Sequence, residues 1–107
     1  MADAEAFSGK MGHLQKLRVT LVILLSQENS ALISRRQRVA GKEIEVMCAE
    51  RDMEEGRDPP VTQEQLDALY GQDAILRQAL RETEQEITRL EELMANIDAD
   101  IAALCQS

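Results

Sequence analysis

The strongest constraint on the fold is a repeat of apolar residues along the C-terminal part of the chain. From Leu66 to Leu104 these residues recur at steps that alternate between three and four. This is the spacing of the a and d positions of a coiled coil, where one stripe of a helix packs against a second helix. We call this stripe a seam. Ten of its twelve positions are apolar, and the positions are Leu66, Leu69, Asp73, Leu76, Leu80, Thr83, Ile87, Leu90, Met94, Ile97, Ile101 and Leu104.

A break separates this helix from the first half of the chain. Gly56 is followed by two prolines, whose backbone nitrogens carry no hydrogen and cannot continue a helix. Thr62 then suits the N-cap of a new helix, with Gln65 three residues later as its capping-box partner. The sequence therefore predicts a turn over about 56–62 and a helix over about 63–105.

Another helix is predicted over about 10–55, after a flexible segment at residues 1–9. Its apolar residues repeat less regularly, because Glu28, Arg35 and Lys42 interrupt the stripe. Two helices of similar length joined by a short turn favour an antiparallel pair. We therefore predict an all-α fold, a long antiparallel two-helix coiled-coil hairpin. The apolar seam positions of its first helix are Leu14, Leu21, Leu25, Leu32, Val39, Val46 and Met53.

The centre of the turn predicts which residues of the two helices face each other. If the turn centres near residues 58 and 59, facing residues have numbers that add up to about 117. This register places Arg35 near Thr83 and Lys42 within a turn of Asp73. Polar residues at such positions commonly specify the register of a coiled coil, and we interpret them in that way rather than as catalytic groups.

The same register argues against covalent or metal chemistry. It places Cys48 and Cys105 far apart along the hairpin, whereas an intramolecular disulfide needs Cα atoms within about 7 Å. It also brings His13 near Cys105, but two ligands do not make a zinc site and no third is close by. No phosphate-binding glycine loop or nucleophile–base pair with an orienting third group appears. We expect no enzyme activity, no cofactor and no metal.

Charge and composition exclude several classes of partner. The 20 acidic and 12 basic residues give a net charge of −8, and Phe7 and Tyr70 are the only aromatic residues. Nucleic-acid binding is not expected, since it needs a basic face and rings for stacking. The apolar run from Val19 to Leu25 is far shorter than the ~20 residues of a membrane span, and the acidic N-terminus is unlike a secretory signal. We expect a cytoplasmic protein.

The first helix carries more apolar residues than one facing helix can cover. Six of the seven residues from Val19 to Leu25 are apolar and point all round the helix. A second apolar stripe lies further along, off the main seam. Something else must cover these residues, either a second copy of the hairpin in a homo-oligomer or a helical protein partner. The candidate partner-binding residues are Val19, Val22, Ile23, Ile33, Ile44 and Met47.

One stretch resembles a known family. The run from Leu21 to Leu32, followed by Lys42 and Glu43, resembles the first helix of bacterial flagellar export chaperones of the FlgN and FliT type. The apolar repeats around Asn96 resemble their later helix. Such chaperones hold C-terminal helices of hook-associated or cap proteins. The resemblance implies that cargo contacts Leu90, Leu93, Met94, Ile97 and Ile101.

Two functions remain open from the sequence. The first is a non-catalytic, cytoplasmic chaperone or adaptor that shields a helical partner, as in helix-in-groove recognition. The alternative is a structural coiled-coil protein whose excess apolar surface is covered by self-association.

Overall fold

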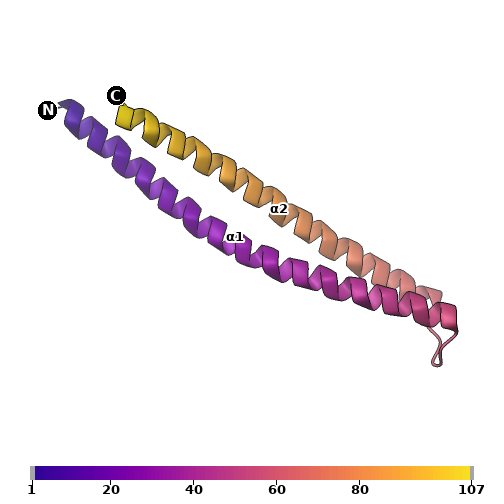
Figure 1. Cartoon of the computed structure of the whole chain (residues 1–107). Helices are drawn as coiled ribbons and strands as arrows, with labels where there is room; N and C mark the ends of the chain where they lie inside the picture. Colours follow the sequence, from indigo (N-terminus) through magenta and orange to yellow (C-terminus); the bar gives the residue numbers. More distant parts are fainter. Residues whose placement is uncertain (1, 107) are drawn as a thin grey trace. The chain divides into compact units, whose positions relative to one another are not determined.

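The protein is an all-α helical hairpin. The computed structural model describes residues 2–106 and has, over that range, two helices and no strand (Figure 1). Helix α1 runs from Ala2 to Glu55 and helix α2 from Gln63 to Gln106. The predicted fold class is confirmed, and α1 ends and α2 begins where the sequence predicts.

The N-terminus differs from the prediction of a flexible segment at residues 1–9. Met1 lies outside the described residues, but α1 already begins at Ala2, so the prediction is wrong for residues 2–9. Asp3 and Glu5 lie in the first helical turn, where negative side chains interact favourably with the partial positive charge of a helix N-terminus. The acidic residues near the start of α1 thus favour the helix.

A glycine ends α1. Gly56 has a φ of 63°, in the left-handed region that glycine adopts without steric cost. Its N–H donates to the carbonyl oxygen of Met53 at 3.3 Å, and the N–H of Arg57 donates to that of Asp52 at 3.1 Å. These two bonds form a Schellman motif, which satisfies carbonyl groups that the end of the helix leaves free.

The start of α2 is the predicted capping box. The backbone N–H of Gln65 donates to the Thr62 hydroxyl at 3.1 Å, and the backbone N–H of Thr62 donates to the Gln65 side chain at 3.0 Å. Leu66 is buried beside this cap and Val61 is half-buried. The chain direction after the turn is therefore set by local hydrogen bonds and by burial of one apolar residue.

The hairpin comprises two compact units. The first unit combines α1 up to Ser30 with α2 from Gln85 onward, and the second runs from Ala31 to Glu84 and includes the turn. In the first unit the buried core consists of Leu21, Ile87 and Leu90. In the second unit it consists of Val39, Ala49, Leu66 and the hydroxyl-bearing Thr83.

Every predicted seam residue of α2 is buried or half-buried, so the repeat identified this seam correctly. The α1 seam was predicted less completely. Ala49 is 9% exposed and belongs to the core, whereas Met53 is 36% exposed and Asp52 is half-buried. From Leu25 onward the predicted α1 series advances by seven residues, so it includes only one of the two seam positions in each heptad. Ala49 occupies one of the positions that this series omits.

Polar contacts between the helices match the predicted register. In the second unit Arg35 donates a hydrogen bond to the Thr83 hydroxyl, as predicted. The Lys42 ammonium donates to Gln72 at 2.8 Å, next to Asp73 in the sequence. Asp73 itself accepts from Arg77 at 2.8 Å, and its second carboxylate oxygen is buried without a partner.

Candidate functional site

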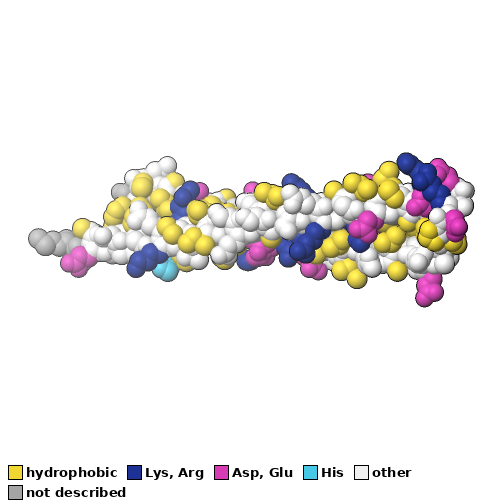
Figure 2. Space-filling model, turned by 90° about the horizontal axis from the view of Figure 1, so that it is seen from below, with side chains coloured by type: hydrophobic (Ala, Val, Ile, Leu, Met, Phe, Trp, Pro, Cys, Tyr) yellow, Lys and Arg dark blue, Asp and Glu magenta, His cyan; other side chains and the backbone are white. Residues whose placement is uncertain are grey.

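All α1 residues predicted to contact a partner lie on the surface. Their side chains reach solvent in both units, and Figure 2 shows apolar side chains between the charged ones on one face. Such exposure is unusual for large aliphatic residues, because leaving them in water forgoes about 1.5–3 kcal/mol each. The exposed fractions are 60% for Val19, 43% for Val22, 52% for Ile23, 59% for Ile33, 62% for Ile44 and 57% for Met47.

The α2 residues implied by the family resemblance fall into three groups. Leu90 is only 2% exposed, so it belongs to the core of the first unit and its implied contact with cargo is corrected. Met94, Ile97 and Ile101 are half-buried in the seam. Leu93 is 39% exposed and lies beside the seam. On α2, the candidate partner-binding surface therefore begins after Leu90 and extends toward the C-terminus.

Leucines on both helices flank the seam of the first unit on the same side. Leu24 directly precedes the seam residue Leu25, and Leu93 directly precedes the seam residue Met94. In an antiparallel pair, residues that precede the a positions of the two helices lie on the same side of the seam. Leu17 holds the same position one heptad before Leu24. Leu17, Leu24 and Leu93 are each 39% exposed.

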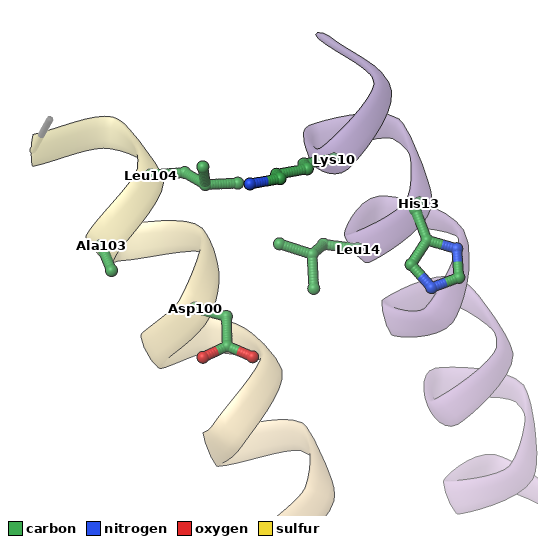
Figure 3. Close-up of a pocket in the computed structure, with 6 residues that line it drawn as sticks. All are labelled: Lys10, His13, Leu14, Asp100, Ala103 and Leu104. Atoms are coloured by element: carbon green, nitrogen blue, oxygen red, sulfur yellow. The ribbon is translucent and has the colours of Figure 1, made fainter. Parts of the chain in front are cut away.

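A hollow opens between the helices near the termini of the first unit. Figure 3 shows Leu14 of α1 and Leu104 of α2 pointing into it from opposite sides, with Lys10 and Asp100 at its edges. His13 and Ala103 complete the lining. We call the surface made by this hollow and the flanking leucines the terminal groove. Its apolar residues are Leu14, Leu17, Leu24, Leu93, Ile97 and Leu104.

The two walls of the terminal groove carry opposite charges. Residues 10–24 of α1 include three basic and no acidic residues, whereas residues 91–104 of α2 include four acidic and no basic residues. One ion pair crosses between them, from Arg18 to Asp98 at 2.8 Å, and both side chains are about half exposed. A helix lying in the groove would therefore meet an acidic wall on one side and a basic wall on the other.

A local ion pair lies on α2 just before the acidic residues of its wall. The guanidinium of Arg89 donates to both carboxylate oxygens of Glu86, at 2.5 and 2.9 Å. This hydrogen bonding holds the pKa of Glu86 below its ordinary value. Both residues therefore stay charged near neutral pH, and the carboxylate of Glu86 is already paired with a residue of its own helix.

His13 and Cys105, which the predicted register brings near each other, do not line the same hollow. His13 lines the terminal hollow, whereas both cysteines are exposed free thiols and Cys105 is outside the lining. Within residues 2–106, no three His, Cys, Asp or Glu side chains gather closely enough to hold a metal ion. Neither helix, over the same range, has a stretch long and apolar enough to cross a bilayer.

The second unit contains a tyrosine whose environment alters its pKa. Tyr70 lies beside Glu50, Met53 and Leu66 around a small hollow near the turn. Partial burial raises the pKa of Tyr70 above its ordinary value of 10.0, and the charges of Glu50 and Asp67 raise it further. The ring is 43% exposed. Its environment explains the shift without any reactive partner.

Comparisons with protein families, with characterised proteins and with solved structures found no match to this chain. The candidate site is thus defined by the geometry of the first unit. The family resemblance implied Leu93 and Ile97, whereas the sequence analysis did not single out Leu17 and Leu24 as binding residues. The signal was present, because both residues directly precede a seam position and extend its apolar width.

Proposed function

We propose that this protein is a non-catalytic binding protein, a chaperone or adaptor that holds a helix of another protein in the terminal groove. The observation that supports the proposal is the incomplete core at this end of the first unit. Beyond Leu21 and Leu90, the seam residues Leu14, Ile97 and Leu104 are all only half-buried. A third helix laid on them would complete their burial, as in helix-in-groove recognition.

The chemistry of the groove specifies the helix it would accept. From Leu104 to Leu93 the groove extends over about eleven residues of helix, or roughly 16 Å at 1.5 Å per residue. The partner would be an amphipathic helix of about three turns with one apolar stripe. Its two edges would be basic toward α2 and acidic toward α1, to complement the charged walls.

We further propose a cytoplasmic location and a role like that of flagellar export chaperones. The family resemblance of the run from Leu21 to Leu32 supports this role, and the bound helix would then belong to an exported flagellar protein. Two exposed free thiols suit a reducing compartment. Shielding an apolar helix before export would keep that helix from aggregating.

The test begins with capture from the native host, using the tagged full chain. Leu93→Glu places a charge in the groove at a residue that is already 39% exposed, so the hairpin should still fold. Ile75→Glu is the matched control, because Ile75 is 71% exposed and belongs to the second unit. We expect one protein to co-purify in stoichiometric ratio with the wild type and the control and to be lost with Leu93→Glu.

Reconstitution then identifies the bound segment. The amphipathic helix of the captured protein is made as a peptide and titrated into the purified full chain by calorimetry. A fall in affinity of at least about tenfold with Leu24→Glu or Leu93→Glu, but not with Ile75→Glu, would support the proposal. Equal binding to all variants, or no helical segment that binds, would contradict it.

A further inference from the structure

A second coiled-coil stripe lies on α1 in the second unit. The exposed residues Ile33, Gln37, Ala40, Ile44 and Met47 follow steps of four and three, and none is charged. We call these residues the outer stripe. Ile33, Ile44 and Met47 are 59%, 62% and 57% exposed. The same steps continue toward the N-terminus through uncharged residues at positions 30, 26, 23 and 19.

The outer stripe cannot be covered by α2 of the same chain. Ala40 directly follows the buried seam residue Val39, so helical geometry turns it about 100° away from the seam. Ile44 lies still further round the helix. A 3–4 spacing on this side of α1 is the pattern that pairs with another helix. A helix other than α2 would be needed to cover it.

The charges beside the outer stripe identify a self-complementary surface. Arg36 and Glu43 directly precede Gln37 and Ile44, so they flank the stripe on the same side, one heptad apart. Within residues 2–106, Arg36 has no hydrogen-bond or ion-pair partner. The nearest cation to Glu43 is Arg77, at 3.9 Å. A surface with one free cation and one weakly paired anion at this spacing complements a reversed copy of itself.

We propose that two copies of this chain associate through their outer stripes in an antiparallel arrangement. Ile33 of one copy then packs against Ile44 of the other, and Ala40 packs against Gln37. Arg36 lies beside Glu43 of the second copy, and twofold symmetry produces this ion pair twice. A parallel arrangement would instead place Arg36 opposite Gly41, with no opposite charge to meet.

The other flank of the outer stripe permits close approach. It carries the small residues Ser34 and Gly41, which the antiparallel register places opposite each other. A Cβ added at Gly41 would meet no atom within 4 Å, so packing inside the chain does not require glycine there. Glycine inside a helix costs about 1 kcal/mol relative to alanine. Close approach of a second helix would give a reason for a residue without a side chain at position 41.

The first test measures the molecular mass of the full chain by sedimentation equilibrium across micromolar concentrations. We expect a dimer for the wild type and for the control Ile75→Glu. Ile44→Glu should raise the dimer dissociation constant at least about 100-fold, because it buries a charge against Ile33 of the second copy. A monomeric wild type would overturn the proposal, as would a dimer unaffected by Ile44→Glu. Circular dichroism checks that each variant remains helical.

Charge reversal tests the register at low ionic strength. Arg36→Glu replaces two attractions by two repulsions and should raise the dissociation constant roughly tenfold. The double variant Arg36→Glu with Glu43→Arg restores opposite charges and should recover wild-type association. If the double variant associates no better than the single one, the antiparallel register is wrong.

Disulfide mapping distinguishes antiparallel from parallel copies. In a Cys48→Ser, Cys105→Ser background, Ile33→Cys and Ile44→Cys are prepared separately, mixed and oxidised. The antiparallel dimer should give the mixed disulfide between the two variants, and neither variant alone should cross-link. Cross-linking within each variant alone would show a parallel pair and overturn the proposal. Because the terminal groove lies in the first unit, Ile44→Glu should retain partner binding whatever the outcome here.

Discussion

Arg35 donates a hydrogen bond to the hydroxyl of Thr83 within the seam of the second unit. Thr83 is 3% exposed, and its hydroxyl also donates to the carbonyl oxygen of Ala79 at 3.1 Å. The Thr83 hydroxyl thus accepts one hydrogen bond and donates another within the helix pair. A shift of one helix by a turn would separate Arg35 from the Thr83 hydroxyl, so this contact favours one register.

Removing the Thr83 hydroxyl tests whether Arg35 and Thr83 stabilise the protein as a coupled pair. Thr83→Leu leaves the Arg35 guanidinium half-buried without its acceptor and should lower the free energy of unfolding by about 1–2 kcal/mol. The double variant Arg35→Leu with Thr83→Leu should be at least as stable as the wild type, because an apolar seam replaces a polar pair. Urea denaturation at fixed chain concentration measures both. Additive losses in the double variant would refute a coupled pair.

The buried and exposed leucines of α2 should respond differently to truncation. Leu90→Ala should lower the free energy of unfolding by about 2–4 kcal/mol, because Leu90 is 2% exposed and its removal leaves a cavity. Leu93→Ala should cost less than about 1 kcal/mol, since this side chain is already partly in water. Denaturation of the purified variants without partner makes the comparison. Equal losses would place Leu93 in the core instead of in the groove.

Two glycines should show opposite effects of substitution by alanine. Gly56→Ala should lower the free energy of unfolding by about 1 kcal/mol or slightly more, because the φ of 63° is unfavourable for a residue with a Cβ. Gly71→Ala should raise it by about 0.5–1 kcal/mol, since Gly71 is inside α2 and an added Cβ meets nothing within 4 Å. Thermal melts of both variants check the signs.

Tyr70 provides a spectroscopic probe of the second unit, because it is the only tyrosine in the chain. The raised pKa of Tyr70 means that the folded protein favours the neutral phenol. The contribution of this group to stability is therefore present below pH 10.0 and is lost as the pH rises through the folded pKa. Titration of tyrosinate absorbance should give a midpoint above that of unfolded chain in denaturant. Glu50→Gln should lower the midpoint, and an unchanged midpoint would rule out the influence of Glu50.

Local chemistry and periodicity were sufficient to predict most of the fold. The capping box at Thr62 and the α2 seam depend on residue types at fixed spacings, which a sequence displays directly. The start of α1 at Ala2 was missed because no capping signal marks it. Ala49 was missed because a small residue contributes little to an apolar pattern.

The candidate site was less accessible from the sequence. Spacing identifies which residues belong to a seam, but it does not determine how deeply each of them is buried. Leu90 and Leu104 both occupy the predicted α2 seam, yet Leu90 is 2% exposed and Leu104 is only half-buried. That difference depends on how the α1 leucines pack over each position, which only the folded pair determines.

The most direct test of the terminal groove is a methyl NMR titration of leucine-labelled full chain with the helical peptide of its captured partner. We predict that the methyl signals of Leu14, Leu17, Leu24, Leu93 and Leu104 shift together and saturate at one peptide per chain. Those of Leu66, Leu76 and Leu80 in the second unit should remain unchanged. Saturable shifts confined to the second unit, or none in the groove, would contradict helix binding at this site.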